Sequence, residues 1–458
     1  MRYRASMAFC VAEVWLLAAC TGYRAQPLAG ARAPLSPLEI RTIDVPSAQG
    51  IGRVVLKVDP FDGLDENEVA ALAVLRSPEL RVARAAAKVA HAQAFSAGLL
   101  AEPQLGFSRD FTLSSTPDVT SAFAISIAQD LGALVTAAAK RRGRTALEHR
   151  ADLELLWQEL QVMARARQLF TQSWALQQSV ALLREQQAIA IQRADALVKA
   201  LERRWIGAAA AGVGLASQSS IDTLLADVLR QQTEVRLNLH ALIGLAPDAP
   251  MQLNAAPRRA PFQREAIDAA KRNLALRRAD LLALQQGYVA QESQLRASVL
   301  SQFPPLSFSV ARARDTAGIR TRGYGVSLAL PLFGGARAAV AIELADRERL
   351  RAEYDARLSS TTNDIDLAAE SLRLIESRIP SLEHAVGQLQ SAASNASLAA
   401  SSRDIDQLTY ADLVDAYVGK RVELLAAEQT RADLQTSLAA LLAVDPQQLT
   451  AVAAAGSL

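Results

Sequence analysis

The longest pattern in the chain is a stripe of apolar residues spaced alternately three and four positions apart, from about Leu134 to Trp205. This stretch contains no proline and a single glycine, Gly143. The stripe shifts phase at least once and is marked by Leu153, Leu156, Leu160, Met163, Phe170, Trp174, Val180, Leu183, Ile191, Ala194, Val198 and Leu201. At ~1.5 Å rise per residue such a helix is about 100 Å long, which no compact domain can enclose. The pattern therefore predicts a helix in a coiled-coil-like wall.

A second stripe predicts another long helix, from Gly335 to about Ser402, with a kink at Pro380. Shorter helices are expected to accompany both. One is capped by Ser77 and runs to about Leu100. A glycine- and alanine-rich loop from Gly207 to Gln218 is expected to precede a helix capped by 219–222 that ends at Ile243. A last return helix begins near Asp406.

Between the helices the period changes to two, which predicts β-hairpins at 104–131 and 305–333. One face of each expected strand is apolar and the other is small or polar, although Arg109 interrupts the apolar face. This alternation is typical of outer-membrane barrel strands, while a soluble hairpin over a small core gives the same alternation. The residues expected to face lipid are Leu105, Phe107, Phe123, Ile125, Phe308, Tyr324, Val326 and Leu328.

The order of elements occurs twice, which predicts a tandem duplication. Phe123–Ala128 resembles Tyr324–Ala329, and Leu239–Pro247 resembles Leu438–Pro446, at offsets of about 196 to 202 residues. We therefore expect repeat one at 63–248, repeat two at 249–447 and a tail at 448–458. Each repeat contains a helix, a hairpin, a long helix and a return helix.

The N-terminus is predicted to be a lipoprotein signal peptide at 1–19. Two arginines precede an apolar run that ends in Leu17-Ala18-Ala19-Cys20, which resembles a bacterial lipobox with Cys20 as the lipidated residue. Glu13 is a defect in the apolar run, and an ordinary cleavage site beside an incidental cysteine is the alternative. Residues 20–62, rich in proline and glycine, are expected to form an extended arm with one short strand at Arg53–Val58.

Composition narrows the chemistry of the protein. Half of the residues are hydrophobic but only 5% are aromatic, which suits helices packed closely through small side chains. The net charge of +2 gives no reason to expect a nucleic-acid partner. The four histidines, His91, His149, His240 and His384, show no metal-binding spacing, and no nucleotide-binding or nucleophile–base motif occurs. We therefore expect no enzymatic activity, no cofactor and no metal site.

The lipobox, the two hairpin-bearing repeats and Pro331-Leu332-Phe333-Gly334-Gly335 together resemble the TolC-type outer-membrane efflux family. The resemblance covers Asp65 to Pro446. It implies a mainly α chain with a transmembrane β-barrel portion: three protomers give four strands each to a twelve-stranded barrel, continued by a long α-helical barrel. Residues 96–100 and 129–132 are similar to the heavy-metal-cation branch, but Ala133 and Leu134 depart from that branch's pattern.

Elementary physics favours a homotrimer independently. Four strands cannot close a barrel, and the open edges of a sheet cannot lie in lipid. Three copies give twelve strands, an even number in the known range. The resemblance implies a passive exit duct in the outer membrane, anchored by lipid, extending into the periplasm and working with a periplasmic adaptor and an inner-membrane pump. The rival interpretation is a lipid-anchored periplasmic coiled-coil scaffold without a pore.

The turn between the second long helix and its return helix holds the candidate gate. Its residues are Arg403, Asp404 and Asp406, and Asp222 is expected to hold the equivalent place in repeat one. Three-fold symmetry would arrange lumen-facing carboxylates in a ring, which favours cations and can close by pairing with arginine. Plain capping of the return helix by Asp404 or Asp406 is the alternative role.

Overall fold

The computed structural model describes residues 24–28, 41–46, 53–58, 63–111, 113, 120–254, 261–304, 306–329, 334–402, 404–444 and 449. The chain divides into two units, Met1–Ser36 and Pro37–Leu458. The described residues of the first unit are 24–28, which are exposed and form neither helix nor strand. All elements discussed below belong to the second unit.

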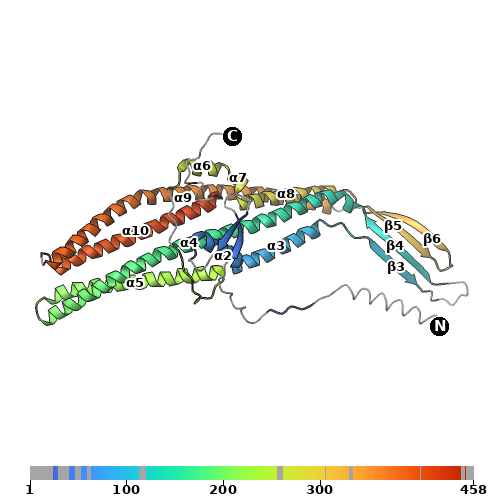
Figure 1. Cartoon of the computed structure of the whole chain (residues 1–458). Coiled ribbons are helices and arrows are strands. Elements are labelled where there is room, and N and C mark those ends of the chain that lie inside the picture. Colours follow the sequence, from blue (N-terminus) through green and yellow to red (C-terminus); the bar gives the residue numbers. More distant parts are fainter. Residues whose placement is uncertain are drawn as a thin grey trace. The chain divides into compact units, whose positions relative to one another are not determined.

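Two very long helices form as the apolar stripes predicted. Helix α4 spans Gly132–Glu202, and helix α9 spans Gly335–Ser401 and continues through Pro380. Their lengths of 71 and 67 residues correspond to about 107 and 100 Å. Each is accompanied along its length by shorter helices (Figure 1). Within the described part of the chain, no helix is both long and apolar enough to pass through a membrane.

Two short helices pack against α4. Helix α3, Pro78–Ala97, covers the half nearer the strands, and α5, Ala208–Ile243, covers the other half. The start of α3 and the end of α5 meet at the middle of α4, where Leu80, Phe170 and Ile243 are fully buried in one apolar cluster. A partly buried ion pair joins α3 to α4 here, with Arg84 Nη2 2.8 Å from Glu159 Oε1. The expectation that shorter helices accompany the long helix is confirmed for this half.

The second half follows the same plan around α9. Helix α8, Ala279–Leu300, and helix α10, Gln407–Leu442, pack against it, and Leu281, Ile365 and Leu438 are fully buried where they meet. Two short helices, α6 at Arg264–Arg272 and α7 at Leu274–Arg277, precede α8. The order of helix, hairpin, long helix and return helix occurs in both halves. The two tandem repeats and their bounds stay a prediction.

The residues before α3 form the helix that the acidic run at Asp65–Glu68 predicts, and one strand more than expected. Helix α2, Glu66–Arg76, begins at a capping box in which Asp65 and Glu68 bond each other's backbone N–H groups. The predicted strand at Arg53–Val58 is confirmed as β2, but it pairs antiparallel with a second strand, β1 at Arg41–Pro46, which the sequence did not indicate. Because Pro46 ends β1 and proline and glycine are frequent nearby in the sequence, the sequence predicted an unpaired extended arm here.

The prediction of a loop between α4 and the return helix is wrong. The segment from Gly207 to Gln218 is helical apart from Gly207 itself, because α5 begins at Ala208. Alanine favours the helix, and Gly214 leaves room for the side chain of Leu197 on α4. Asp222 is therefore not a cap at a turn: it lies inside α5, where its Oδ1 accepts a 2.7 Å hydrogen bond from Gln187 of α4.

Four antiparallel strands form one sheet in the order β3-β4-β5-β6. They span Gln104–Asp110, Ala122–Asp130, Leu306–Arg314 and Arg320–Leu328. Both hairpins thus form where the period-two pattern placed them, and β4 pairs with β5 to join them. Figure 1 shows the sheet beyond the ends of α3, α4 and α8.

Candidate functional site

The register of the sheet brings all eight predicted lipid-facing residues to one face. Directly paired residues in antiparallel strands share a face. Leu105 pairs with Ile127, which pairs with Val310, which pairs with Tyr324. The next row toward the helices contains Gln129, Phe308 and Val326, and the next row away contains Phe107, Ile125, Arg312 and Arg322. We name this surface the apolar face.

The apolar face is uncovered in the single chain. Tyr324 is 83% exposed, Leu105 73% and Val326 63%. An exposed apolar surface of this kind marks contact with a partner or with lipid. The opposite face contains small or polar residues: Gln104, Gly106, Ser108, Asp110, Ala122, Ala124, Ser126, Ala128, Asp130, Ser307, Ser309, Ala311, Ala313, Thr321, Gly323, Gly325 and Ser327.

The sheet is open at both sides. Strand β3 and strand β6 each have one neighbour within the described chain, so the outer side of each carries backbone groups with no partner strand. Open edges of this kind invite pairing with another chain. In an apolar environment open edges must pair with another strand, because no water is present to form hydrogen bonds with the free N–H and C=O groups. The outer sides of β3 and β6 are therefore available for pairing with further strands.

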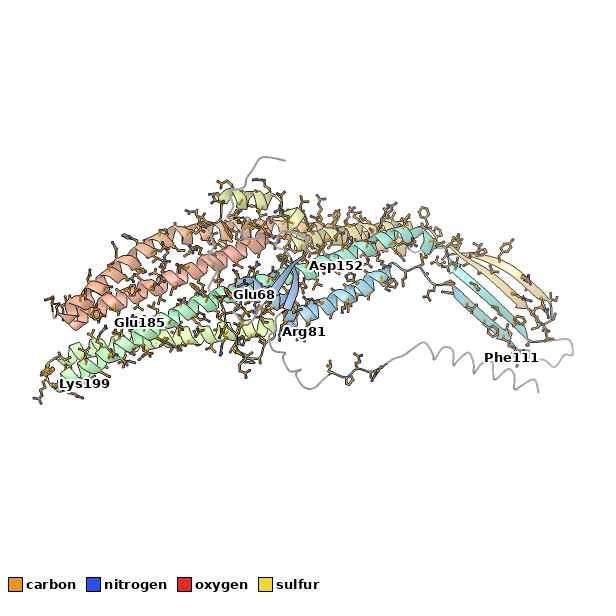
Figure 2. The ribbon with its side chains drawn as sticks, viewed as in Figure 1. Glu68, Arg81, Phe111, Asp152, Glu185 and Lys199 are labelled. Atoms are coloured by element: carbon orange, nitrogen blue, oxygen red, sulfur yellow. The ribbon has the colours of Figure 1, made fainter. Side chains whose placement is uncertain are left out.

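The distal turns, which end α4 and α9, carry charges of opposite sign. Between α4 and α5 lie exposed Arg203 and Arg204, and Arg203 stacks over the Trp205 ring at 4.9 Å. Lys199 precedes them in the last turn of α4 (Figure 2). This basic turn was missed because the sequence placed the return helix too late. Between α9 and α10 lie exposed Asp404 and Asp406.

Asp406 is the N-cap of α10. Its Oδ1 accepts a 2.7 Å hydrogen bond from the Thr409 N–H, as the capping alternative predicted. Asp404 accepts a 2.5 Å hydrogen bond from the Ser402 hydroxyl. Arg403 lies outside the described residues, as does Cys20. The gate and the lipid anchor therefore stay predictions.

The two helix pairs touch each other before they reach the distal turns. Leu183 on α4 and Val228 on α5 pack in one cluster with Val414 and Val418 on α10. Ser217 of α5 donates a 2.5 Å hydrogen bond to Asp415 of α10. These contacts join α4 and α5 to α10 within one chain.

Charged groups along the helix walls pair with one another. The hydrogen bond from Lys420, helped by the contact with Arg378, lowers the pKa of the Glu423 carboxyl. Asp152 on α4, labelled in Figure 2, bonds His91 at 2.8 Å. His240 is buried and bonds the Ala246 carbonyl at 3.0 Å, while His149 and His384 are exposed. No cluster of metal-ligating side chains occurs among the described residues.

No protein-family model and no curated protein sequence matches the chain. Solved structures of outer-membrane channels do match it. VceC of Vibrio cholerae gives a TM-score of 0.68 at 17% identity, over 83% of this chain and 96% of that one. The open state of MtrE of Neisseria gonorrhoeae gives 0.64 at 16% identity, over 94% and 99%. CusC gives 0.65 at 15% identity, over 83% and 92%.

The chain thus has the fold of the TolC-type outer-membrane channels, as the resemblance in sequence order predicted. The CusC TM-score of 0.65 lies between those of VceC, 0.68, and MtrE, 0.64, so the fold does not single out the heavy-metal-cation branch. With identities of 15–17% to these structures, the likeness concerns the architecture.

Proposed function

We propose that the protein is the outer-membrane exit duct of a tripartite efflux system. In this proposal three copies pair strand β6 of one protomer with strand β3 of the next and close a twelve-stranded barrel. Their long helices continue the barrel into the periplasm as a tunnel. The observation that carries the proposal is the two-faced open sheet, since its apolar face suits lipid and its small polar face suits a water-filled lumen.

The duct is passive and has no enzymatic activity. The energy for export would come from an inner-membrane pump, reached through a periplasmic adaptor. CusC is described as forming a transmembrane channel and MtrE as an outer-membrane channel, which supports this role. The rival, a lipid-anchored periplasmic scaffold without a pore, accounts for the helices but gives the exposed apolar face no function.

Purification in detergent followed by reconstitution in planar bilayers tests the proposal. We expect a complex of three chains that migrates faster on a denaturing gel before heating than after, as closed barrels do. We also expect discrete single-channel conductance steps. A soluble chain, or a membrane-bound chain that gives no conductance in any preparation, would favour the scaffold instead.

The proposed anchor at Cys20 is tested separately. We expect Cys20→Ser to lose incorporation of labelled fatty acid while the protein stays in the membrane fraction, because one acyl chain adds only marginal binding to that of a barrel. A mature wild-type protein with a free amino terminus at another residue would refute the anchor.

A further inference from the structure

Five arginines lie on the apolar face at the end of the sheet remote from the helices. The last row of paired residues on this face contains Arg109, Phe123, Arg314 and Arg320, and the row before it contains Arg312 and Arg322. We name these five the arginine belt. Rows on one face are separated by two residues, or about 6.8 Å. The belt therefore directly adjoins the row of Leu105, Ile127, Val310 and Tyr324.

The belt places like charges directly opposite each other. Arg312 pairs with Arg322, and Arg314 pairs with Arg320 across the β5–β6 hairpin. Directly opposed like charges destabilise a sheet. The four described strands carry no carboxylate on this face that could offset the repulsion, because Asp110 and Asp130 belong to the opposite face. The arrangement therefore favours a bound anion.

The contacts within the chain leave the belt open to such an anion. Arg314 donates from Nη2 to the Thr120 hydroxyl at 3.1 Å, and Arg109 stacks over the Phe111 ring at 4.9 Å. Phe111 stands at the remote end of the sheet in Figure 2. Asp315 lies in the β5–β6 turn and accepts a 2.9 Å hydrogen bond from the Ile319 N–H. Arg109, Arg312, Arg320 and Arg322 are exposed.

We propose that the arginine belt binds the phosphate groups of a phosphorylated glycolipid in the outer leaflet of the outer membrane. The inference rests on the proposed function, which turns the apolar face to lipid and the remote end of the sheet to the cell exterior. Acyl chains of one such lipid then lie on the apolar rows, and its phosphates reach the belt one or two rows further on. Guanidinium groups bind phosphate oxygens in a bidentate fashion, which suits arginine better than lysine here.

The belt is continuous around the proposed trimer. Arg109 lies on edge strand β3, while Arg320 and Arg322 lie on edge strand β6. Pairing of β6 with β3 of the next protomer brings these arginines to the same boundary. A lipid bound there bridges two protomers, so that binding also supports the closed barrel.

Native mass spectrometry of the detergent-solubilised trimer tests the inference. The probes are a hexa-acylated glucosamine disaccharide lipid with two phosphates and its dephosphorylated form. We expect the wild type to bind the phosphorylated lipid about tenfold or more tightly, since each arginine near an anionic lipid surface adds appreciably to binding. Arg312→Gln with Arg322→Gln should abolish this preference. Arg236→Gln with Arg351→Gln, which removes two exposed arginines from the helices, should retain it.

The outcomes separate the inference from the proposed function. A trimer that conducts ions but binds both lipids equally overturns the belt and leaves the duct standing. Displacement of the phosphorylated lipid by millimolar inorganic phosphate would identify a site for free anions and overturn the lipid assignment. A chain that forms no conducting trimer overturns the duct and the belt together. The preference is measured on the wild type itself, so the test stands even where the double variant fails to assemble.

Discussion

A buried ionic cluster joins four helices at the residue scale. Asp280, at the start of α8, accepts hydrogen bonds from Arg278 Nε at 2.7 Å and from Arg357 Nε of α9 at 2.9 Å. Arg278 also donates to the Leu441 carbonyl of α10 at 2.9 Å and lies 4.5 Å over the Trp157 ring of α4. Both members of the Arg278–Asp280 pair are almost fully buried. The pair can remain buried because its charged groups form hydrogen bonds with each other and with neighbouring groups.

Removing the Asp280 charge should be costly. We expect Asp280→Asn to lower the free energy of unfolding by about 3–5 kcal/mol, because Arg278 would remain buried without a counter-charge. The measurement is the midpoint of chemical denaturation in detergent. The control is Glu370→Gln, which breaks an exposed pair with Arg373 and should leave the midpoint unchanged. Equal effects of the two changes would contradict a structural role for the cluster.

The partly buried carboxyl group of Glu376 makes the stability of the fold depend on pH. Burial raises the pKa of the Glu376 carboxyl on α9, and Arg431 of α10 offsets part of this rise. Oε1 of Glu376 has no hydrogen-bond partner among the described residues. A pKa raised on folding means that the ionised carboxylate lowers stability above the folded pKa. This loss disappears as the pH falls through the folded pKa toward the ordinary value of 4.5.

We therefore expect Glu376→Gln to melt at a slightly higher temperature than the wild type at pH 7. The difference should shrink as the pH is lowered and should vanish below about pH 4, where the wild-type carboxyl is also neutral. Thermal melting at several pH values measures it. A difference that is constant across the range would mean that the substitution acts through packing and not through charge.

At the scale of single elements, the glycines near the two ends of α5 have opposite roles. Gly244 ends the helix with φ +68°, and a Cβ there would lie 3.0 Å from the backbone oxygen of Arg76. Gly212 lies inside the helix, and no atom would lie within 4 Å of its Cβ. The same substitution should therefore give opposite results at the two positions.

We expect Gly244→Ala to destabilise the fold by about 1–2 kcal/mol, the cost of a left-handed conformation for a residue with a Cβ. Gly212→Ala should stabilise it by up to about 1 kcal/mol through helix propensity. Thermal melting of the two variants beside the wild type measures both effects. Destabilisation by Gly212→Ala would show that another surface packs against this part of α5 in the assembled protein.

Elements with one dominant pattern were predictable from the sequence. The long helices and both hairpins carry a period of three to four or of two over most of their length, so their approximate bounds and faces followed from spacing. The start of α5 did not follow, because glycines that normally break helices are tolerated where α5 packs on α4. The arginine belt was also missed: Arg109 was taken as an interruption of the apolar face, and only the register shows that it belongs to a group.

A charge in the middle of the apolar face tests which side of the sheet meets lipid. We expect Val326→Arg to cost about 2–4 kcal/mol of barrel stability, because the residue would lie near the bilayer midplane. Ser327→Arg places the same side chain on the opposite face and should instead alter conductance while the barrel still assembles. Heat-dependent gel mobility and bilayer recordings measure the two effects. Normal assembly of Val326→Arg would reverse the assignment of the faces.

At the scale of the whole molecule, several surfaces that are exposed in the single chain would be covered in the proposed trimer. The open edges of β3 and β6 and the uncovered apolar face are liabilities in a monomer. The basic turn of Arg203 and Arg204 follows α4, and the acidic turn of Asp404 and Asp406 follows α9. In the proposed trimer both turns would lie at the distal mouth, where their opposite charges favour pairing. The sequence could predict the charges of the acidic turn but not the basic turn.

The acidic turn is proposed to restrict the distal mouth. Neutralising it through Asp404→Asn with Asp406→Asn removes two negative charges per protomer while the cap of α10 survives, because asparagine caps helices about as well as aspartate. A ring of carboxylates favours cations, so its loss should raise conductance or weaken block by trivalent cations in planar bilayers. Asp355→Asn with Glu348→Gln removes two exposed charges from α9 far from the turn and should change neither. Unchanged conductance together with unchanged cation block in the Asp404/Asp406 variant would leave helix capping as the whole role of this turn.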